Sequence, residues 1–509
     1  MSRTETPPER LNPAIARSLP FAVAKRALFL PAWKTDNGRL EVWITTHTDP
    51  HALDQFRLAS SEPVKPVRVS REQLLDALQR VHQEHGIAVE NVLDELPPSM
   101  LASQLAEKPD LLEADNDAPI IQLVNSLIIQ ALRNRASDIH IEPFENNLIV
   151  RFRVDGLLHE ALRPPKPVQA PLMSRIKVMA GLNIAEKRLP QDGALRVQVA
   201  SQDIDVRVSV LPGHYGERLV MRLLEKQGEK TGLSELGLTD AQMGWIRSRM
   251  TASHGIMLVT GPTGSGKSTT LYSILSAINT SEKNIITIED PIEYSLAGVG
   301  QIQVAPKIGL TFASGLRSIL RQDPDVIMVG EIRDLETAEI AIQASLTGHL
   351  VFSTLHTNDS VGAVVRLVNM GIEPFLVSSS VDGVVAQRLV RRLCERCKEA
   401  FAPEASLLRA SVGERRAELL EGARFYRPKG CAGCMGTGYL GRTAVFELLT
   451  MSSAIRALID RRASDLELHR VAREEGMTSL REAGLIKAAE GLTSLEEVFR
   501  VTQERGEVV

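Results

Sequence analysis

The segment GPTGSGKST carries the residue types that bind the phosphates of a nucleotide. It matches the pattern G-x-x-x-x-G-K-[ST] and stands between the apolar stretch GIMLVT and the helical stretch TLYSILSAI. In this context glycines let backbone N–H groups turn toward phosphates, Lys267 supplies a positive charge, and Ser268 offers a hydroxyl to Mg²⁺. The sequence therefore predicts an NTP-binding loop formed by Gly261, Pro262, Thr263, Gly264, Ser265, Gly266, Lys267, Ser268 and Thr269.

Two acidic segments follow this loop and offer the carboxylates that hydrolysis requires. DVIMVGEIRD is an apolar strand that ends in a glycine and Glu331 instead of the usual Asp-Glu pair, so a second carboxylate must come from elsewhere. The strand NIITIEDPIEY ends in Glu289, Asp290 and Glu293, and its proline starts a turn that would carry Glu293 over the strand ends. We predict that Glu331 binds Mg²⁺ and Glu293 orients the attacking water, while Glu289 and Asp290 shape the turn or hold water on Mg²⁺.

Two histidines, His349 and His356, stand at the two ends of the apolar run in TGHLVFSTLHTND. Their spacing is not that of a metal site, and the neighbouring sequence offers no third ligand. His356 would lie at the carboxyl end of a strand, where ligands bind in open α/β sheets. We predict that His356 senses the γ-phosphate, with ordinary packing as the alternative. His349 would lie near the opposite edge, where packing and contact with a neighbouring subunit both remain open.

The four cysteines occur as two CxxC pairs, CERC and CAGC. The polar, proline-rich start MSRTETPPERLNP is not a secretory signal, so disulfides are not expected. Two CxxC pairs are typical of a tetrahedral zinc site with four thiolate ligands, and four unrelated buried thiols are the alternative. The sequence therefore predicts a structural Zn²⁺ in a knuckle that covers residues 391–442, with the ligands Cys394, Cys397, Cys431 and Cys434.

The composition limits the class of protein. At 509 residues the chain is long enough for about three domains, and 43% hydrophobic with 24% charged residues is ordinary for a globular protein. The net charge of -4 and the aromatic content of 4% argue against a surface devoted to nucleic acid, so no nucleic-acid partner is expected. No apolar run reaches the ~20 residues of a membrane span. Any attachment to a membrane must therefore come from a partner.

The apolar pattern predicts successive regions that position these side chains. Residues 1–105 contain the strand-like LEVWITT and an amphipathic helix from Arg71 to about His85, but no catalytic cluster, which favours a small docking domain. Residues 106–118 are acidic and lie in a proline-flanked stretch, as expected of a linker. Residues 237–509 alternate short apolar strands with helices, which predicts an α/β domain with a parallel-rich sheet buried on both faces.

Residues 119–226 are predicted to form an α+β middle domain. IIQLVNSLIIQALRNR has helical spacing, and LIVRFRVDGLLHEAL indicates a hairpin around its Asp-Gly dipeptide. Strict alternation in IDVRVSV puts Arg207 on the face opposite the valines, and ERLVMRLL puts Arg218 and Arg222 together on one face. For any single arginine, a solvated cross-strand ion pair is the expected role.

Taken together, the motifs resemble those of the secretion ATPase superfamily, in which GPTGSGKST, ITIEDPIEY, GEIRDLETAEIA, TGHLVFSTLHTND and the tetracysteine knuckle occur in this order. Within it, LLEADNDAPIIQLVNSL, ASDIHIEPFE, VRFRVDGLLHE and AEKRLPQDG look like the type II secretion system assembly ATPase, the GspE family. LPFAVAKR is similar to the start of that family's docking domain. The resemblance covers nearly the whole chain, and the glycine before Glu331 is the family's own form of the motif.

The resemblance implies a RecA-like P-loop ATPase domain and roles for particular residues. Glu293 matches the water-activating glutamate, and Arg207 and Arg222 match arginines that the middle domain sends toward the γ-phosphate of ATP, with Arg218 a weaker candidate. The family's four boxes fall on residues 261–269 (Walker A), 288–294 (aspartate box), 326–334 (Walker B) and 348–359 (histidine box).

The resemblance also implies partners and a task. The family forms a homohexamer with ATP and Mg²⁺ between the middle and RecA-like domains. Its first domain binds the cytoplasmic part of a GspL-like bitopic inner-membrane protein, and a polytopic platform protein and acidic phospholipids are further expected partners. The implied function is hydrolysis of ATP to ADP and phosphate at the cytoplasmic face of the inner membrane. This hydrolysis would drive pseudopilus assembly and the export of folded proteins.

Three other functions are considered. A type IV pilus extension ATPase has the same chemistry, but LLEADNDAP and LPFAVAKR favour secretion, and pilus retraction ATPases lack the tetracysteine element. A non-catalytic scaffold is hard to reconcile with both carboxylates beside the phosphate loop. A nucleic-acid translocase would use basic residues near the knuckle, although such a cluster is more often a solvated face or a contact with acidic lipids. These residues are Arg388, Arg391, Arg392, Arg396 and Lys398.

Overall fold

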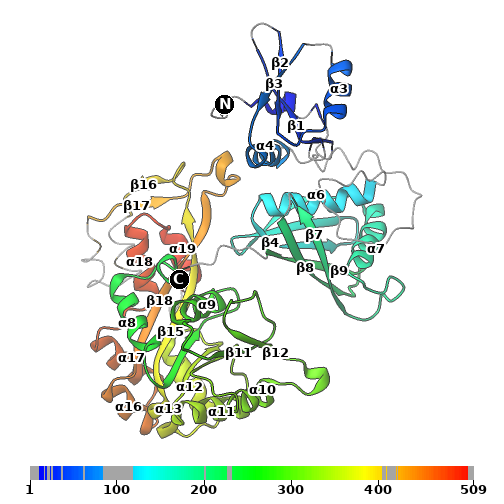
Figure 1. The fold of residues 1–509 in the computed structure, drawn as a ribbon. Coiled ribbons are helices and arrows are strands. Elements are labelled where there is room, and N and C mark those ends of the chain that lie inside the picture. The colour runs from blue at the N-terminus through cyan, green and yellow to red at the C-terminus, as the bar shows by residue number, and fades with distance from the viewer. Residues whose placement is uncertain are drawn as a thin grey trace. The chain divides into compact units, whose positions relative to one another are not determined.

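The computed structural model describes residues 11–83, 119–225, 232–403, 409, 420 and 422–502, apart from residues 17, 20–22, 25, 26, 36, 37, 61, 62, 200 and 201. The predicted linker and the last part of the predicted docking domain lie outside these residues. The chain divides into two compact units, residues 1–228 and 229–509. The first contains two separate sheets, and the second contains a seven-stranded and a two-stranded sheet (Figure 1).

A three-stranded sheet with the order β1-β2-β3 forms the first part of the chain. The central strand β2 is the one predicted in LEVWITT, and it pairs antiparallel with β1 and parallel with β3. Buried Leu30, Val42 and Leu74 join the sheet to its helices. The last of these helices, α4, confirms the predicted amphipathic helix. The elements are α1 (Pro13–Ala16), β1 (Phe29–Lys34), β2 (Leu40–Ile44), α3 (Pro50–Ala59), β3 (Val64–Arg68) and α4 (Arg71–Gln83).

A six-stranded sheet with the order β6-β5-β4-β9-β8-β7 follows, and all its neighbouring strands are antiparallel. The predicted hairpin is confirmed, since β5 and β6 turn at Asp155 and Gly156, both with positive φ. The elements are α6 (Pro119–Arg133), β4 (Ala136–Pro143), β5 (Leu148–Val154), β6 (Leu157–Leu162), α7 (Gln169–Met179), β7 (Gln191–Val199), β8 (Gln202–Leu211) and β9 (Arg218–Glu225).

The two faces of this sheet differ because side chains alternate along each strand. One face packs on α6 and α7 through an apolar core that includes Ile139, Val206 and Met221. The predicted alternation in β8 is confirmed, because its isoleucine and valines are buried while the residues between them are partly exposed. The opposite face therefore presents the polar residues of the same strands, among them Arg207 and Arg222.

The second unit is built on a sheet with the order β12-β11-β13-β14-β10-β15-β18. Its neighbouring strands are parallel except for β18, which is antiparallel to β15. This confirms the predicted parallel-rich α/β domain. The strands are β10 (Gly255–Thr260), β11 (Ile285–Glu289), β12 (Gly300–Gln303), β13 (Val326–Val329), β14 (Leu350–Leu355), β15 (Val381–Leu393) and β18 (Tyr439–Thr450).

Helices cover both faces of this sheet, so β10, β13 and β14 are buried along their whole length. One core joins the strands to α8 and α9, and the other joins them to α10–α13, α16 and α17. No described helix is both long and apolar enough to cross a membrane. The helices are α8 (Asp240–Met250), α9 (Lys267–Ile278), α10 (Phe312–Ile319), α11 (Leu335–Leu346), α12 (Ser360–Asn369), α13 (Pro374–Ser380), α16 (Ser453–Asp460), α17 (Asp465–Glu474), α18 (Leu480–Ala489) and α19 (Leu495–Val501).

The neighbouring strands β15 and β18, of which β18 is the edge strand, lead directly into the predicted knuckle. β15 ends immediately before Cys394, and β18 begins shortly after Cys434. The short strands β16 (Glu399–Phe401) and β17 (Phe425–Arg427) form an antiparallel pair in the segment between them. The knuckle is therefore a continuation of β15, which borders β10, and of its antiparallel neighbour β18.

Candidate nucleotide site and metal centre

The predicted phosphate loop lies between the end of β10 and the start of α9, which confirms its strand–loop–helix setting. Two of its glycines are required because β15 approaches closely. A Cβ on Gly261 would lie 2.5 Å from the backbone oxygen of Gln387, and a Cβ on Gly266 would lie 2.8 Å from Gln387 Nε2. Both glycines also have positive φ, which other residues rarely adopt. The loop thus directs backbone N–H groups and the α9 N-terminus at one place, an arrangement that binds phosphate.

Lys267 is the first residue of α9 and is partly buried. Its Nζ donates hydrogen bonds to the backbone oxygens of Gly261 at 2.8 Å and Pro262 at 3.1 Å. Burial lowers the pKa of Lys267 to about 8, with Glu331 opposing this shift and Arg388 adding to it. The ammonium of Lys267 can exchange its hydrogen bonds to the two loop carbonyls for hydrogen bonds to phosphate oxygens. The negative charge of the phosphates would also raise its pKa and so favour the charged form.

Glu331 follows β13, and His356 directly follows the neighbouring strand β14. The buried carboxylate of Glu331 forms an ion pair with Arg333, and His356 Nε2 lies 3.3 Å from Glu331 Oε2. The hydrogen bond to Glu331 raises the pKa of Arg333, and the negative charge of Asp290 adds to this effect. The carboxyl ends of three adjacent strands therefore bring Lys267, Glu331 and His356 together, as expected for ligand sites in such sheets.

Tyr272 of α9 fixes the turn that follows β11. Its hydroxyl donates to the buried carboxylate of Glu289 and accepts a hydrogen bond from the backbone N–H of Glu293 at 3.3 Å. Burial and the neighbouring Glu289 raise the pKa of Tyr272 far above its usual range, so the hydroxyl stays a donor. Glu289 also accepts from Thr287 and Gln301, so it shapes the turn, which is one of its two predicted roles. The side chain of Glu293 is exposed.

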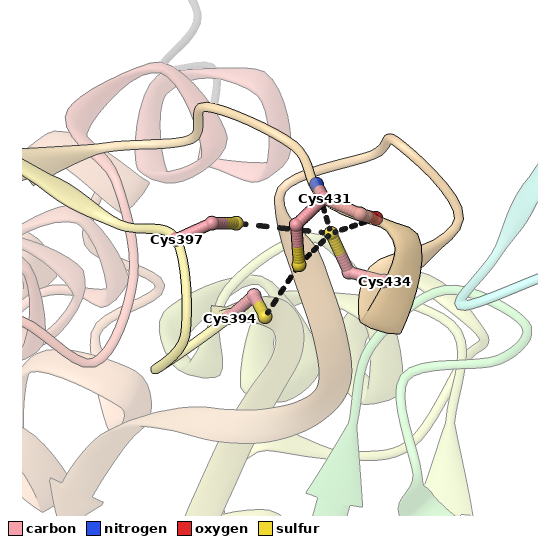
Figure 2. A group of neighbouring side chains, drawn as sticks. All are labelled: Cys394, Cys397, Cys431 and Cys434. Atoms are coloured by element: carbon pink, nitrogen blue, oxygen red, sulfur yellow. Dashed lines mark hydrogen bonds between the residues drawn. The ribbon is translucent and has the colours of Figure 1, made fainter.

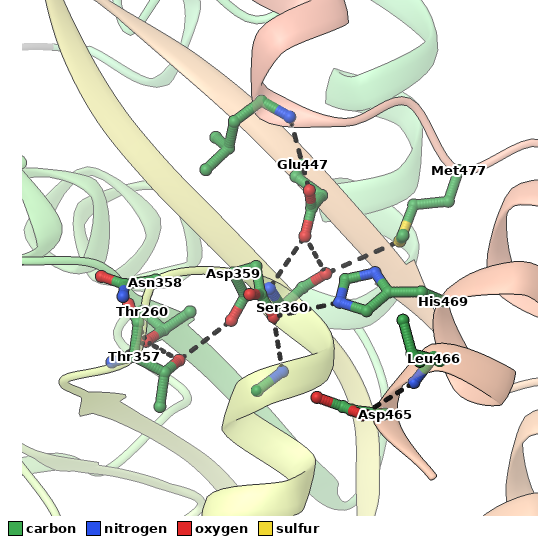
Figure 3. A network of polar contacts seen from close by, with 12 residues as sticks. Thr260, Thr357, Asn358, Asp359, Ser360, Glu447, Asp465, Leu466, His469 and Met477 are labelled. Atoms are coloured by element: carbon green, nitrogen blue, oxygen red, sulfur yellow. Dashed lines mark hydrogen bonds and ion pairs between the residues drawn. The ribbon is translucent and has the colours of Figure 1, made fainter. Parts of the chain in front are cut away.

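The predicted histidine box is held on two sides, as Figure 3 shows. Thr357 Oγ1 lies 2.7 Å from Thr260 Oγ1, at the end of β10. Immediately after the box, the backbone N–H and hydroxyl of Ser360 donate to Glu447 of β18 at 2.8 and 2.5 Å. Burial raises the pKa of Glu447, although the bonds from Ser360 oppose the shift. The loop that carries His356 is thus tied both to the strand before the phosphate loop and to the edge strand.

His349 lies at the other end of β14, away from the phosphate loop. Its Nδ1 lies 2.9 Å from the backbone oxygen of Ala344 and 3.2 Å from Thr347 Oγ1. These contacts belong to its own helix–strand connection, which favours the packing alternative.

Some residues of this site were not predicted from the sequence. Arg333 could have been found, because it stands two residues after Glu331. Gln387 carried no such signal, since it reaches the phosphate loop only because β15 pairs with β10. There its Oε1 accepts a hydrogen bond from Thr270 Oγ1 of α9 at 2.7 Å.

The basic residues near the knuckle do not act as one patch. Arg391 is 14% exposed, its guanidinium bonds to Glu497 at 2.8 Å, and it stacks 3.8 Å from the ring centre of Tyr439. Lys398 pairs with Glu395. Arg388 instead donates to a backbone oxygen of the histidine box. The contacts of Arg391 and Arg388 therefore lie within the protein, which weakens the interpretation of this segment as a nucleic-acid surface.

The four predicted zinc ligands converge at the end of β15 and β18, as shown in Figure 2. All four sulfur atoms lie within 4.8 Å of one another. Three of the separations are 3.7, 3.8 and 3.9 Å. A tetrahedral site with Zn–S bonds of ~2.3 Å requires sulfur atoms ~3.8 Å apart, so the geometry fits this ion. The ligands are Cys394, Cys397, Cys431 and Cys434.

The environment of two of the cysteines acts on their thiolate forms in opposite directions. Burial raises the pKa of Cys397 to about 12, so without a cation this thiol stays protonated at neutral pH. For Cys434 burial acts in the same direction, but backbone N–H groups of Cys431 and Gly438 donate to its sulfur and lower the pKa to about 6. Amide donors directed at a sulfur stabilise a thiolate, the form that binds metal.

In the middle domain, the predicted arginines lie on the polar face of the sheet. The strand register places Arg207 directly beside Arg222. Arg222 Nε donates to Asp138 Oδ1 at 3.0 Å, and Arg218 forms an ion pair with Glu142. These are the predicted cross-strand ion pairs, with the difference that both carboxylates are buried while the arginine side chains stay exposed. Such a face presents several fixed guanidinium groups to an anion.

Two family profiles match this chain. The family described as "Type II/IV secretion system protein" matches residues 113–500, and the MshEN domain matches residues 3–88. The chain is similar to the type II secretion system ATPase E of Vibrio cholerae, at 46% identity over 96% of this chain and 97% of that protein. It is also similar to the type II secretion system protein E of Pectobacterium carotovorum, at 48% identity over 96% and 97%.

Among solved structures, the chain is similar to the ATPase DotB of Legionella pneumophila, with a TM-score of 0.54. The identity is 24%, and the likeness covers 74% of this chain and 94% of DotB. At this identity the comparison supports the shared fold.

Proposed function

Because the chain belongs to the type II secretion system ATPase family, we propose that it is the ATP-hydrolysing motor that drives pseudopilus assembly and the export of folded proteins. Its secretion relatives match it over nearly their full length, which favours secretion over type IV pilus extension. The observation that carries the proposal is the convergence of Lys267, Glu331 and His356 beside the phosphate loop.

The roles of the site residues follow from their positions. The phosphate loop from Gly261 to Thr269 would hold the phosphates of ATP, and Ser268 and Glu331 would bind Mg²⁺. Mg²⁺ neutralises charge on the β- and γ-phosphates when bound. For Glu331 to bind a metal, its ion pair with Arg333 must open. Arg333 would then be replaced by Mg²⁺ as the partner of the carboxylate. His356 stands where it can follow this change, because it faces the same carboxylate.

Glu293 is the proposed residue that orients the attacking water. Its carboxylate is exposed, while Tyr272 holds its backbone from the side of α9. Because α9 begins at Lys267, the helix that binds the phosphates also places the base. The fold thus fixes the backbone of Glu293 while its carboxylate stays exposed and available to a water molecule.

The tetracysteine cluster is proposed to hold a structural Zn²⁺. Four thiolates fill a tetrahedral site, so no position is left open for a substrate. The support comes from the sulfur separations and from the amide donors on Cys434.

The remaining proposals concern assembly. We place ATP between the nucleotide domain and the polar face of a middle domain in a homohexamer, with Arg207 and Arg222 reaching the γ-phosphate. ATP would clamp the two domains together, and hydrolysis would release them. The MshEN-like first domain is proposed to bind the cytoplasmic domain of an inner-membrane secretion protein. This docking, with acidic phospholipids and a platform protein, would keep the chain at the cytoplasmic face of the membrane.

The test is phosphate release by the purified full-length chain with and without Mg²⁺. The wild type should release phosphate only with Mg²⁺, and Lys267→Ala should reduce the rate at least ~100-fold because the charge at the β- and γ-phosphates is lost. Lys307→Ala, which removes an exposed lysine, is the matched control and should match the wild type. Equal rates for Lys267→Ala and the wild type would contradict the proposed site.

A further inference from the structure

We propose that Arg388 is a positioning residue for ATP hydrolysis, which holds the histidine box against the phosphate loop so that both loops meet the nucleotide as one unit. This inference rests on the proposed function, since it concerns the same nucleotide site. None of the sequence boxes contains Arg388, which lies in strand β15, between β10 and β18 in the sheet.

The strand register explains how a distant residue reaches both loops. β15 runs parallel to β10, and Ala386 pairs with Thr260, the last residue before the phosphate loop. The next residues of β15, Gln387 and Arg388, therefore run alongside the loop itself. Because consecutive side chains of a strand point to opposite faces, the two residues serve different partners. Gln387 bonds to α9 through Thr270, and Arg388 turns toward the histidine box.

The contacts of the guanidinium group join the two loops. Its Nη2 donates to the backbone oxygen of Asn358, two residues after His356, at 2.7 Å. Its Nη1 donates to the backbone oxygen of the preceding residue, Gln387, at 3.2 Å and would lie 3.2 Å from a Cβ on Gly261. The planar group thus lies against the first glycine of the phosphate loop while it holds the histidine box. Lysine, a point charge without this planar fork, cannot make both contacts equally well.

The surroundings keep this arginine charged and in place. It lines a cavity of about 700 Å³ together with His356, Asp359 and His469. Burial lowers the pKa of Arg388, but the negative charges of Asp359 and Glu447 oppose this shift. An arginine remains protonated in such surroundings. The group therefore holds the loop by a charge-assisted hydrogen bond, which is stronger than one between neutral groups.

The histidine box has other anchors that do not depend on Arg388. Thr357 bonds to Thr260, and Ser360 bonds to Glu447, as Figure 3 shows. Loss of the arginine should therefore leave the loop folded but free to shift relative to Gly261. Such a shift would move His356 relative to Glu331 and slow the chemical step. The phosphate loop would keep its own hydrogen bonds and its affinity for ADP.

The experiment compares Arg388→Gln and Arg388→Lys with the wild type in the full-length chain. Arg392→Gln is the matched control, because Arg392 is an exposed arginine four residues further along the same strand. Three quantities are measured for each protein: kcat for ATP, the Kd for ADP, and the Kd for aluminium fluoride in the presence of ADP. Melting temperatures report whether each variant is folded.

Arg388→Gln should lower kcat and weaken aluminium fluoride binding by about tenfold or more, because a misplaced loop costs transition-state stabilisation. The ADP affinity and the melting temperature should stay near those of the wild type. Arg388→Lys should recover part of the loss, and Arg392→Gln should be normal. If Arg388→Gln lowers the stability, the smaller change in Arg388→Lys tests the same split between kcat and ADP affinity.

Two results would overturn the inference. One is a kcat for Arg388→Gln within a factor of about two of the wild type. The other is a parallel loss of ADP affinity and kcat, which would make the residue part of nucleotide binding. Failure of the proposed function has a different signature, since the wild type and Arg392→Gln would then both bind ADP without hydrolysing ATP.

Discussion

Strands β15 and β18 lead to two candidate binding sites of opposite character. Beside the phosphate loop, their side chains are already bonded to protein groups, as Gln387 is to Thr270 and Glu447 is to Ser360. At the knuckle, the same strands bring four thiols within 4.8 Å of one another. Several of the contacts of these sulfur atoms are with each other. The nucleotide site is thus held in shape by its own hydrogen bonds. The cysteine cluster has the geometry to hold a cation, which would keep four mutually repelling thiolates together.

This difference predicts how each site fails. A change in the nucleotide site should remove one chemical step and leave the fold intact. A change in the cluster should remove the metal and with it the local fold, while nucleotide binding continues.

Glu293→Gln should have the largest effect on activity while leaving both sites folded. The amide keeps the size of the side chain but cannot orient and deprotonate water, so turnover should fall at least ~100-fold. ATP binding, measured with a fluorescent analogue, should be unchanged. Glu282→Gln, at an exposed glutamate in the turn at the other end of β11, is the control. Full activity of Glu293→Gln would show that another group acts as the base.

Cys394→Ser should disrupt the cysteine cluster and leave the nucleotide site intact. The variant should lose its zinc, measured by atomic emission, and melt at a lower temperature because metal binding contributes directly to folding. ADP binding should remain. Glu395→Ser, at the exposed neighbouring position, should keep its metal. A full complement of zinc or an unchanged melting temperature in Cys394→Ser would contradict the proposed metal site.

Gln387→Ala tests whether the two sites are independent, because this residue lies on the strand that leads to both. Its loss removes a buried hydrogen bond to α9, worth about 1 kcal/mol of stability, so ADP affinity should fall by at most about fivefold. The zinc content should not change, since the cluster depends on its own ligands. A loss of zinc together with ADP affinity would mean that β15 couples the two sites.

His469→Gln should have the smallest effect, and the effect should depend on pH. His469 of α17 and Asp359 form an ion pair at 3.6 Å. The hydrogen bond to Asp359 raises the pKa of His469, so its stabilising contribution is complete below the unfolded pKa near ~6.5 and disappears as pH rises through the folded value. The wild type should therefore exceed His469→Gln in melting temperature more at pH 6 than at pH 9. An equal difference at both pH values would exclude this pairing.

The pKa of Asp359 sets the lower end of the pH range in which the ion pair with His469 stabilises the fold. Burial opposes ionisation of Asp359, but bonds from His469 and the backbone N–H of Gly362 lower its pKa. Its contribution is present above the unfolded value near ~3.8 and disappears as pH falls through the lower folded value. The ion pair is therefore strongest between the two limits, in mildly acidic solution.

The parts of the site that the sequence predicted are those encoded by short spacing. The phosphate loop and the two CxxC pairs are contiguous motifs, and alternation in β8 placed Arg207 on the correct face. Strand order and register were not accessible in this way, because β10 lies between β14 and β15, which come much later in the chain.

The residues that the sequence did not assign to the site depend on that order. Arg388 and Gln387 reach the phosphate loop through the pairing of β15 with β10. Tyr272 reaches Glu289 because α9 packs over β11. In the same way, the buried partner of Arg222 is a residue of β4, far away in sequence but next to β9 in the sheet. Spacing along the chain carries none of this information.

The most direct test of the account is ATP hydrolysis by the purified full-length chain under three conditions. These are no addition, DNA, and the cytoplasmic domain of the inner-membrane partner with vesicles of acidic phospholipid. A membrane-docked secretion motor predicts stimulation by the partner and vesicles and none by DNA. Stimulation by DNA that falls steeply with salt would contradict the account and identify a translocase.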